Sequence, residues 1–308
     1  MAFYLGIDGG GTKTTCVVAD DSVTLGSATT GGSNITRHGD ARVREALHAA
    51  VQAACAAARV DPARIESACI GLSGAGRPEV RDAVAAMMGE VLRGRIVVVS
   101  DLETTLQAAF GDGAGVIVIS GTGSIAYGRD ARGQTARAGG WGLTISDEGS
   151  AQWIGRAAVS AVLNAHDAGE NPALWATILS LWNLTSLDEL VRHANGSPSP
   201  DFSRLFPAIL AAAENPRPSG AWTGHPDPVA KNVLERAGME LSALAKNVIR
   251  RLFRKEASVP VAMSGGVFRQ SERVRQVFYN KLRAEFPQAN VNPTVVEAVH
   301  GAIQLARK

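Results

Sequence analysis

The sequence predicts an α/β protein in which one structural unit occurs twice. Strand and helix patterns alternate along the first third of the chain, and a glycine-rich segment joins two strand patterns near its start. A similar arrangement returns about 112 residues later, and a repeat of that size indicates a duplicated fold. The 308 residues, 45% of them hydrophobic, are enough for two units with cores of their own.

The first third of the chain has the pattern of a mixed sheet. Residues 3–8 and 14–19 are apolar or β-branched runs joined by glycines, which is typical of a hairpin. Residues 23–29 can form a third antiparallel strand. The pattern continues with helix 40–59, strand 65–72, helix 79–92, strand 96–100 and helix 103–110. This order favours a sheet with parallel and antiparallel pairs, covered by helices.

The second part begins in the same way. Strand patterns at 115–119 and 125–128 flank a glycine-rich segment, and a turn at 130–133 leads to a strand near 134–138. Helical patterns follow as far as residue 255, with one long run over 227–255. The chain continues with strand 259–263, helix 270–286 and a helical pattern at 295–307, which we expect to pack on the first half.

We therefore expect two lobes. The first comprises residues 1–113 and 290–308, and the second comprises residues 114–289.

Composition excludes several classes of protein. The net charge is +2 and the basic residues are scattered, so nucleic-acid binding is not expected. The three cysteines, Cys16, Cys55 and Cys69, form no C-x-x-C pair and support neither disulfides nor a metal cluster within one chain. The absence of a signal-peptide pattern and of a long apolar stretch indicates a cytoplasmic protein with no membrane contact.

The segment DGGGTKT at residues 8–14 has the composition of a phosphate-binding turn. Its glycines let backbone N–H groups approach an anion closely. A strand pattern follows it, so it is neither a Walker A loop nor a dinucleotide-binding fingerprint, which both lead into a helix. Asp8 lies at the strand end, where a carboxylate can hold Mg²⁺ through water. A plain hairpin turn is the alternative interpretation.

Two further glycine-rich segments strengthen this hypothesis. SGTGS at residues 120–124 occupies the matching position in the repeat, so that two opposed turns can hold the phosphates of ATP. SGGVF at residues 264–268 lies between a strand and a helix and suits an adenine or ribose. Each segment taken alone is also consistent with an ordinary tight turn.

Asp101 directly follows an apolar strand and is the candidate catalytic base. A carboxylate there lies at the edge of a sheet, where clefts of α/β proteins open. It can accept the proton of a sugar hydroxyl that attacks the γ-phosphate of ATP. Alternatively, Asp101 caps the helix that follows.

The segment GGWGLTISDEGS at residues 139–150 is a candidate polyol-binding loop. It carries two carboxylates, Asp147 and Glu148, which can accept hydrogen bonds from sugar hydroxyls. The alternative role for these carboxylates is stabilisation of a helix N-terminus. Asn34, in GGSN, is by default a turn residue.

Taken together, these segments resemble the BadF/BadG/BcrA/BcrD-type ATPases, and among them the N-acetylglucosamine kinase branch. The resemblance runs nearly the whole length of the chain. It is carried by GIDGGGTKT, GGSN, SD at 100–101, VISGTGSIAYG, GGWG with DEGSAQWIG at 139–155, HPDPVAKNVLERAG at 225–238, and SGGVF. It implies a duplicated ribonuclease H-like (actin-like ATPase) fold, with two lobes, mixed sheets and an interlobe cleft.

The resemblance also implies roles for residues. An amino sugar phosphorylated at O6 would contact Asn34, Asp101, Gly140, Asp147 and Glu148, with Asp101 as catalytic base. ATP would contact Gly10, Gly11, Thr12, Lys13, Gly121, Thr122, Gly123, Gly265 and Gly266. Mg²⁺ would be held by Asp8, and the protein would be a homodimer. The chain departs from the family pattern at Ser146, where the family usually has glycine, and in the longer stretch at 293–301.

Three alternatives to this function remain. One is a kinase of glucosamine or another hexose. The second is an ATPase activator of a 2-hydroxyacyl-CoA dehydratase-type enzyme, which needs an iron–sulfur cluster shared between subunits; the cysteines fall in strand and helix patterns, which argues against it. The third is a sugar-responsive regulator, for which there is no room for a DNA-binding segment before Phe3.

Overall fold

The computed structural model describes residues 2–214, 226–254 and 257–308. The chain divides into two compact units. Unit 1 comprises Met1–Ile117, Gly128–Gln134 and Val296–Lys308, and unit 2 comprises Val118–Tyr127 and Thr135–Val295. His225 and Lys255, which belong to segments discussed above, lie outside the described residues.

The sheet of unit 1 has the strand order β3-β2-β1-β4-β5. Its strands are β1 (Phe3–Gly9), β2 (Lys13–Ala19), β3 (Thr24–Gly31), β4 (Ile65–Leu72) and β5 (Arg95–Ser100). The first three pair in antiparallel fashion, whereas β4 runs parallel to both β1 and β5. The mixed sheet inferred from the sequence is therefore confirmed.

Helices cover this sheet because their apolar residues lie along one side. The helices are α1 (Ile35–His38), α2 (Asp40–Ala58), α3 (Pro78–Gly89) and α4 (Asp101–Phe110). In α2 the buried residues Val43, Leu47, Ala50, Val51 and Ala54 recur at helical spacing and join the core with strand residues such as Leu5 and Ile7.

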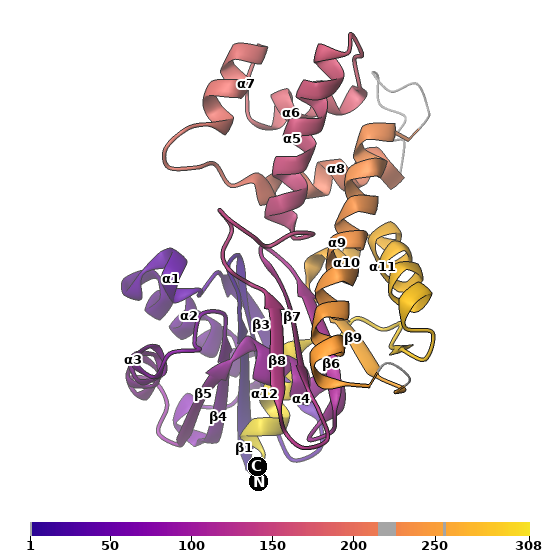
Figure 1. The fold of residues 1–308 in the computed structure, drawn as a ribbon. Helices are drawn as coiled ribbons and strands as arrows, with labels where there is room; N and C mark the ends of the chain where they lie inside the picture. The colour runs from indigo at the N-terminus through magenta and orange to yellow at the C-terminus, as the bar shows by residue number, and fades with distance from the viewer. Residues whose placement is uncertain (1, 215–225, 255–256) are drawn as a thin grey trace. The chain divides into compact units, whose positions relative to one another are not determined.

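The helix α12 (Ala298–Ala306) completes unit 1, as the sequence predicts. Figure 1 shows it in yellow, and it packs against β1, β4 and α4. Val299 and Ile303 are buried against Val17 and Ala19 of β2. Gly301 lets α12 approach α4 closely, because a Cβ at this position would overlap the backbone carbonyl of Thr104.

The second sheet has the order β10-β9-β6-β7-β8. Its strands are β6 (Gly115–Ser120), β7 (Ser124–Arg129), β8 (Thr135–Gly139), β9 (Pro260–Ser264) and β10 (Asn290–Val291). When it is read from β8, the order matches that of the first sheet strand for strand: a three-stranded meander first, then two later strands. The duplication predicted from the glycine-rich segments is thus confirmed.

The strand β10 is a difference from the sequence expectation. It has only two residues, which pair with Pro260 and Val261 of β9. Residues 290–295 consequently lie in unit 2, and unit 1 resumes at Val296.

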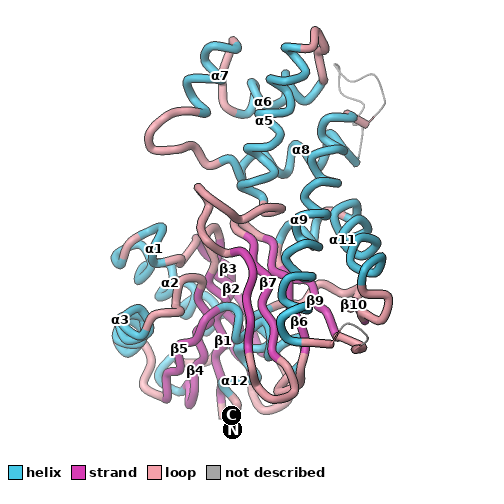
Figure 2. The backbone as a smooth tube through the Cα atoms, viewed as in Figure 1, coloured by secondary structure: helices cyan, strands magenta, loops and turns pink. Residues whose placement is uncertain are grey.

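The helices of unit 2 are α5 (Ala151–Asp167), α6 (Ala173–Leu181), α7 (Leu187–Ala194), α8 (Phe206–Glu214), α9 (Pro228–Leu252), α10 (Gly266–Gln270) and α11 (Glu272–Glu285). Figure 2 shows that α5–α8 form a part of the chain made of helices and loops. Asp227 caps α9 by accepting hydrogen bonds from the N–H groups of Val229 and Ala230. Across the described parts of the chain, none of the helices combines the length and apolar character needed to span a membrane.

We predict that Gly301→Ala destabilises the protein by about 1–3 kcal/mol, because the new methyl group forces α12 away from α4. Gly76→Ala is the matched control, since a Cβ there meets no atom within 4 Å. Chemical denaturation of the three proteins measures the difference. Equal midpoints for the two variants would show that this close approach is not needed.

Candidate functional site

The parallel strands of unit 1 end side by side. Gly9 of β1 pairs with Leu72 of β4, and Leu72 pairs with Ser100 of β5. The residues that follow, Gly10, Ser73 and Asp101, therefore emerge together from one edge of the sheet. This is the edge at which ligands of α/β proteins usually bind.

The turn between β1 and β2 is held on several sides. The N–H of Gly10 donates to the carbonyl of Lys13 at 2.9 Å, and the carbonyl of Gly10 accepts from the N–H groups of Ser33 and Asn34 at 3.0 and 3.2 Å. The ring Nε2 of His38 lies 2.8 Å from the carbonyl of Gly11. The carbonyl groups of Gly10, Gly11 and Lys13 therefore have hydrogen-bond partners within the protein.

The side chains of the turn are open to a ligand. Thr12 and Lys13 are exposed, whereas Asp8, the second-last residue of β1, is half-buried. A carboxylate thus lies directly beside the glycine turn.

The side chain of Asn34 makes two hydrogen bonds. Its amide donates to Ser73 Oγ at 3.2 Å. Asn34 is also the N-cap of α1, since its Oδ1 accepts from the N–H of Arg37 at 3.2 Å. Asn34 is therefore a helix cap and also a partner of Ser73, the residue that follows β4.

Ser100, and not Asp101, caps α4. Ser100 Oγ accepts from the N–H of Glu103, and the Glu103 carboxylate accepts from the N–H of Ser100 at 2.8 Å, which forms a capping box. The alternative in which Asp101 serves as the cap is therefore wrong. The side chain of Asp101 is therefore not used as the cap of α4.

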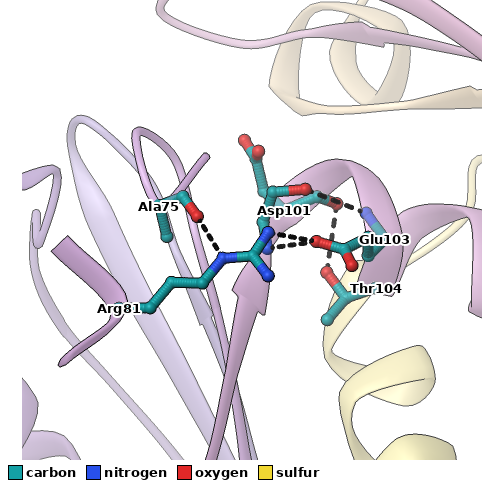
Figure 3. A network of polar contacts seen from close by, with 6 residues as sticks. Ala75, Arg81, Asp101, Glu103 and Thr104 are labelled. Atoms are coloured by element: carbon teal, nitrogen blue, oxygen red, sulfur yellow. Dashed lines mark hydrogen bonds and ion pairs between the residues drawn. The ribbon is translucent and has the colours of Figure 1, made fainter. Parts of the chain in front are cut away.

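Hydrogen bonds hold the backbone of Asp101, and an ion pair lies next to it. Its carbonyl accepts hydrogen bonds from the hydroxyls of Thr104 and Thr105, at 3.0 and 2.6 Å. Arg81 of α3 lies 3.0 Å from the Glu103 carboxylate in an ion pair. Figure 3 shows the Asp101 carboxylate directed away from this pair.

Burial raises the pKa of Asp101 to about 6, because the ionised carboxylate loses solvation in this position. The N–H groups of Leu102 and of Asp101 itself and the Ser73 hydroxyl favour the ionised form and act against this rise, while the nearby Glu103 charge adds to it. A carboxylate with such a pKa is ionised at neutral pH and is a stronger base than an ordinary aspartate.

The glycine turn between β6 and β7 is the counterpart in unit 2. The N–H of Gly121 donates to the carbonyl of Gly123 at 2.9 Å. The carbonyls of Gly121 and Thr122 accept from the N–H groups of Ala151 and Gln152, the first residues of α5. The start of α5 therefore fixes this turn.

The loop at 139–150 brings Asp147 beside this turn. A Cβ on Gly123 would lie 2.8 Å from Asp147 Oδ2, and Asp147 is only 5% exposed. Its Oδ1 is buried without a hydrogen-bond partner. Burial raises the pKa of Asp147, while hydrogen bonds from the N–H groups of Ser124 and Gly142 lower it and the Glu148 charge raises it further. A buried acceptor without a partner is suited to a ligand's hydroxyl.

Serine side chains hold the same loop. Ser120 Oγ donates to the carbonyl of Gly149 at 2.9 Å, and Ser124 Oγ donates to the carbonyl of Glu148 at 2.7 Å. Ser150 caps α5 by accepting from the N–H of Trp153. The cap of α5 is therefore a serine, although Asp147 and Glu148 stand just before the helix.

The third glycine-rich turn meets the end of β6. Gly265 has φ of 99°, a backbone conformation that favours glycine, and a Cβ on it would overlap the backbone of Ser120. Gly266 begins α10.

The structure thus assembles the expected residues as two sets, one in each unit. The set in unit 1 is Asp8, Gly10, Gly11, Thr12, Lys13, Asn34 and Asp101. The set in unit 2 is Gly121, Thr122, Gly123, Gly140, Asp147, Glu148, Gly265 and Gly266.

Sequence reasoning missed Ser73. It follows strand 65–72 just as Asp101 follows strand 96–100, and this shared position was the available signal. A serine next to a glycine is also typical of an ordinary turn, so the sequence alone does not single it out.

Comparison with known proteins gives consistent results. A model of the BadF/BadG/BcrA/BcrD ATPase family matches residues 5–304. An N-acetylmuramic acid/N-acetylglucosamine kinase from Clostridium acetobutylicum is 30% identical over 312 residues, which cover 100% of this chain and 99% of the relative. An N-acetyl-D-glucosamine kinase from Dictyostelium discoideum is 27% identical over 98% of this chain and 97% of that protein.

A solved structure of a candidate N-acetylglucosamine kinase from Chromobacterium violaceum superposes with a TM-score of 0.76. The two sequences are 26% identical, and the match covers 99% of each chain.

We predict that Asp147→Ala lowers the free energy of unfolding by about 1–3 kcal/mol, because alanine is strained at the positive φ of 66° at this position. Asp147→Asn should cost less, since asparagine tolerates a positive φ and keeps the size of the side chain. Denaturant titrations measure both. If the alanine variant were as stable as the asparagine variant, the backbone conformation of residue 147 would carry no weight.

Proposed function

Because this chain belongs to the BadF/BadG/BcrA/BcrD ATPase family, we propose that it is an ATP-dependent kinase that phosphorylates the 6-hydroxyl of an amino sugar. N-acetylglucosamine is the first candidate substrate, since relatives that match along the whole chain are kinases of this sugar. The observation that carries the proposal is the Asp101 carboxylate, held at the sheet edge beside a glycine turn with a pKa of about 6.

Asp101 is the proposed general base. Its carboxylate accepts the proton of the 6-hydroxyl as that oxygen attacks the γ-phosphorus of ATP. The new bond joins the sugar oxygen to phosphorus, the bond from phosphorus to the bridging oxygen breaks, and ADP leaves. The proton remains on Asp101 until it is released to solvent.

The glycine turns are the proposed phosphate contacts. Small residues at Gly10, Gly11, Gly121 and Gly123 leave backbone N–H groups accessible to an anion. The exposed side chains of Thr12 and Lys13 add a hydroxyl and a positive charge, and the half-buried Thr122 adds a second hydroxyl. Gly265 and Gly266 are proposed to lie against the adenosine.

Asp8 fits Mg²⁺ as a single protein ligand. The described ranges contain no cluster of three or more side chains that could ligate a metal. A magnesium ion that keeps several waters and binds substrate phosphates needs only one or two carboxylates from the protein. Bound there, Mg²⁺ would neutralise negative charge on the phosphates.

We propose candidate sugar contacts within each unit. The buried Oδ1 of Asp147 can accept a hydrogen bond from a hydroxyl group, and Glu148 and the backbone at Gly140 lie in the same loop. Asn34 supplies an amide that can bond a hydroxyl or an acetamido group. We also propose a cytoplasmic homodimer, as the family resemblance implies.

The role of dehydratase activator is disfavoured by the cysteines. Cys16, Cys55 and Cys69 are all buried. Burial raises the pKa of the Cys55 thiol to about 11 and that of Cys69 to about 12, so neither presents a thiolate to iron.

We predict that the purified protein phosphorylates N-acetylglucosamine when it is supplied with ATP and Mg²⁺. Release of ADP, coupled to oxidation of NADH, measures the rate on a panel that includes N-acetylmuramic acid, glucosamine and glucose. Mass spectrometry and NMR of the product locate the phosphate. Failure to phosphorylate any sugar, or a bound iron–sulfur chromophore, would refute the proposal.

We predict that Asp101→Asn lowers kcat by about 10²–10⁴-fold, because the amide cannot accept the proton. The variant should unfold at the same or a higher temperature, since it removes a carboxylate whose ionised form is disfavoured by burial. Steady-state kinetics and thermal melting test both parts. An equal loss of sugar binding and turnover, with a lower melting temperature, would instead indicate a structural role.

A further inference from the structure

His38, the last residue of α1, contacts the glycine turn between β1 and β2. Its ring Nε2 lies 2.8 Å from the carbonyl oxygen of Gly11. A carbonyl oxygen can only accept a hydrogen bond, so Nε2 carries a proton and donates it. His38 is half-buried and belongs to none of the motifs that carry the family resemblance.

A glycine makes room for this contact. A Cβ at Gly32 would overlap the carbonyl of Gly11 and would lie 2.8 Å from His38 Nε2. The imidazole and the turn therefore meet beside Gly32, where only a residue without a side chain fits both of them.

The preceding peptide of the turn is held by the same part of the chain. The carbonyl of Gly10 accepts from the N–H groups of Ser33 and Asn34, at 3.0 and 3.2 Å. In a trans peptide the carbonyl and the N–H that follows it point in opposite directions. The bonds to the carbonyls of residues 10 and 11 therefore turn the N–H groups of Gly11 and Thr12 away from residues 32–38.

These two N–H groups are available to an anion. Within the described residues, neither the N–H of Gly11 nor that of Thr12 has a hydrogen-bond partner. Thr12 is exposed and Gly11 is half-buried. Successive backbone N–H groups on one side of a turn are a recurrent binding site for phosphate.

From this geometry we propose that His38 is a positioning residue, which orients the peptide between Gly11 and Thr12 so that its N–H faces the phosphates of ATP. The inference rests on the proposed function, in which this turn contacts ATP. Without the imidazole the peptide can rotate, because glycine adopts conformations that other residues rarely reach. Binding of ATP would then have to order the peptide, and the affinity would fall.

The effect should be confined to the nucleotide. Asn34, the proposed sugar contact at the start of α1, is held by bonds that do not involve the imidazole of His38. Its amide donates to Ser73 Oγ, and its Oδ1 accepts from the N–H of Arg37. Loss of the imidazole should therefore weaken the binding of ATP and leave the binding of the sugar unchanged.

The test uses three substitutions of His38 and a matched control. His38→Ala removes the donor. His38→Gln keeps it, since the glutamine amide nitrogen is as many bonds from Cα as the histidine Nε2, whereas the amide of His38→Asn is one bond too short. His48→Ala removes the same kind of bond elsewhere, from Nε2 to the carbonyl of Met87 at 2.8 Å.

Calorimetry measures the binding of AMPPNP, a non-hydrolysable analogue of ATP, with Mg²⁺ and without sugar. We expect His38→Ala and His38→Asn to bind it about three- to tenfold more weakly, and His38→Gln and His48→Ala to bind it as the unchanged protein does. In steady-state kinetics, KM for ATP should rise in His38→Ala while KM for N-acetylglucosamine stays the same.

An unchanged affinity of His38→Ala for AMPPNP would overturn the inference, as would an equal loss in His38→Gln or His48→Ala. If His38→Ala does not fold, His38→Asn is measured under the same criterion. AMPPNP binding that depends on His38, in a protein that phosphorylates no sugar, would refute only the kinase proposal. A protein that does not bind AMPPNP would refute both.

Discussion

The register between β1, β4 and β5 is the constraint on which the site in unit 1 depends. Gly9, Leu72 and Ser100 form one row across three parallel strands, so the next residue of each strand reaches the same edge. A slip by one residue would turn the side chains of a strand to the opposite face. Buried residues on these strands, such as Ile7 and Ile70, resist such a slip because it would expose them. The hydrophobic core thereby determines where Gly10, Ser73 and Asp101 lie, although these residues are not part of the core.

Both units place a carboxylate where ionisation is costly. Asp101 and Asp147 have raised pKa values for the same main reason, loss of solvation, and each is held by neighbouring backbone groups. The fold offsets part of this cost locally, because the N–H groups of Leu102 and Ser124 favour the ionised forms of Asp101 and Asp147 respectively. Carboxylates with raised pKa values, which lower the stability of the folded protein, are typical of sites that act on a ligand.

The sequence predicts the regular elements well, since hydrophobic periodicity reports burial directly. The strand predicted at 65–72 has these bounds in the structure, and the helix predicted at 40–59 is α2, Asp40–Ala58. It failed at β10, where two residues cannot show a period, and at the start of α4, where Ser100 and Asp101 are both good caps. The bond between Asn34 and Ser73 could not be predicted, because it depends on which strands are neighbours in the sheet.

The packing of α12 has a consequence for the order in which the protein forms. A ribosome releases the residues of unit 2 before it reaches Val299 and Ile303, which cover β2 in unit 1. Until then, α4 covers only part of the sheet face on which α12 packs, although all of the strands have already been synthesised. Unit 1 therefore cannot complete its core until its last helix has been synthesised, after all of unit 2.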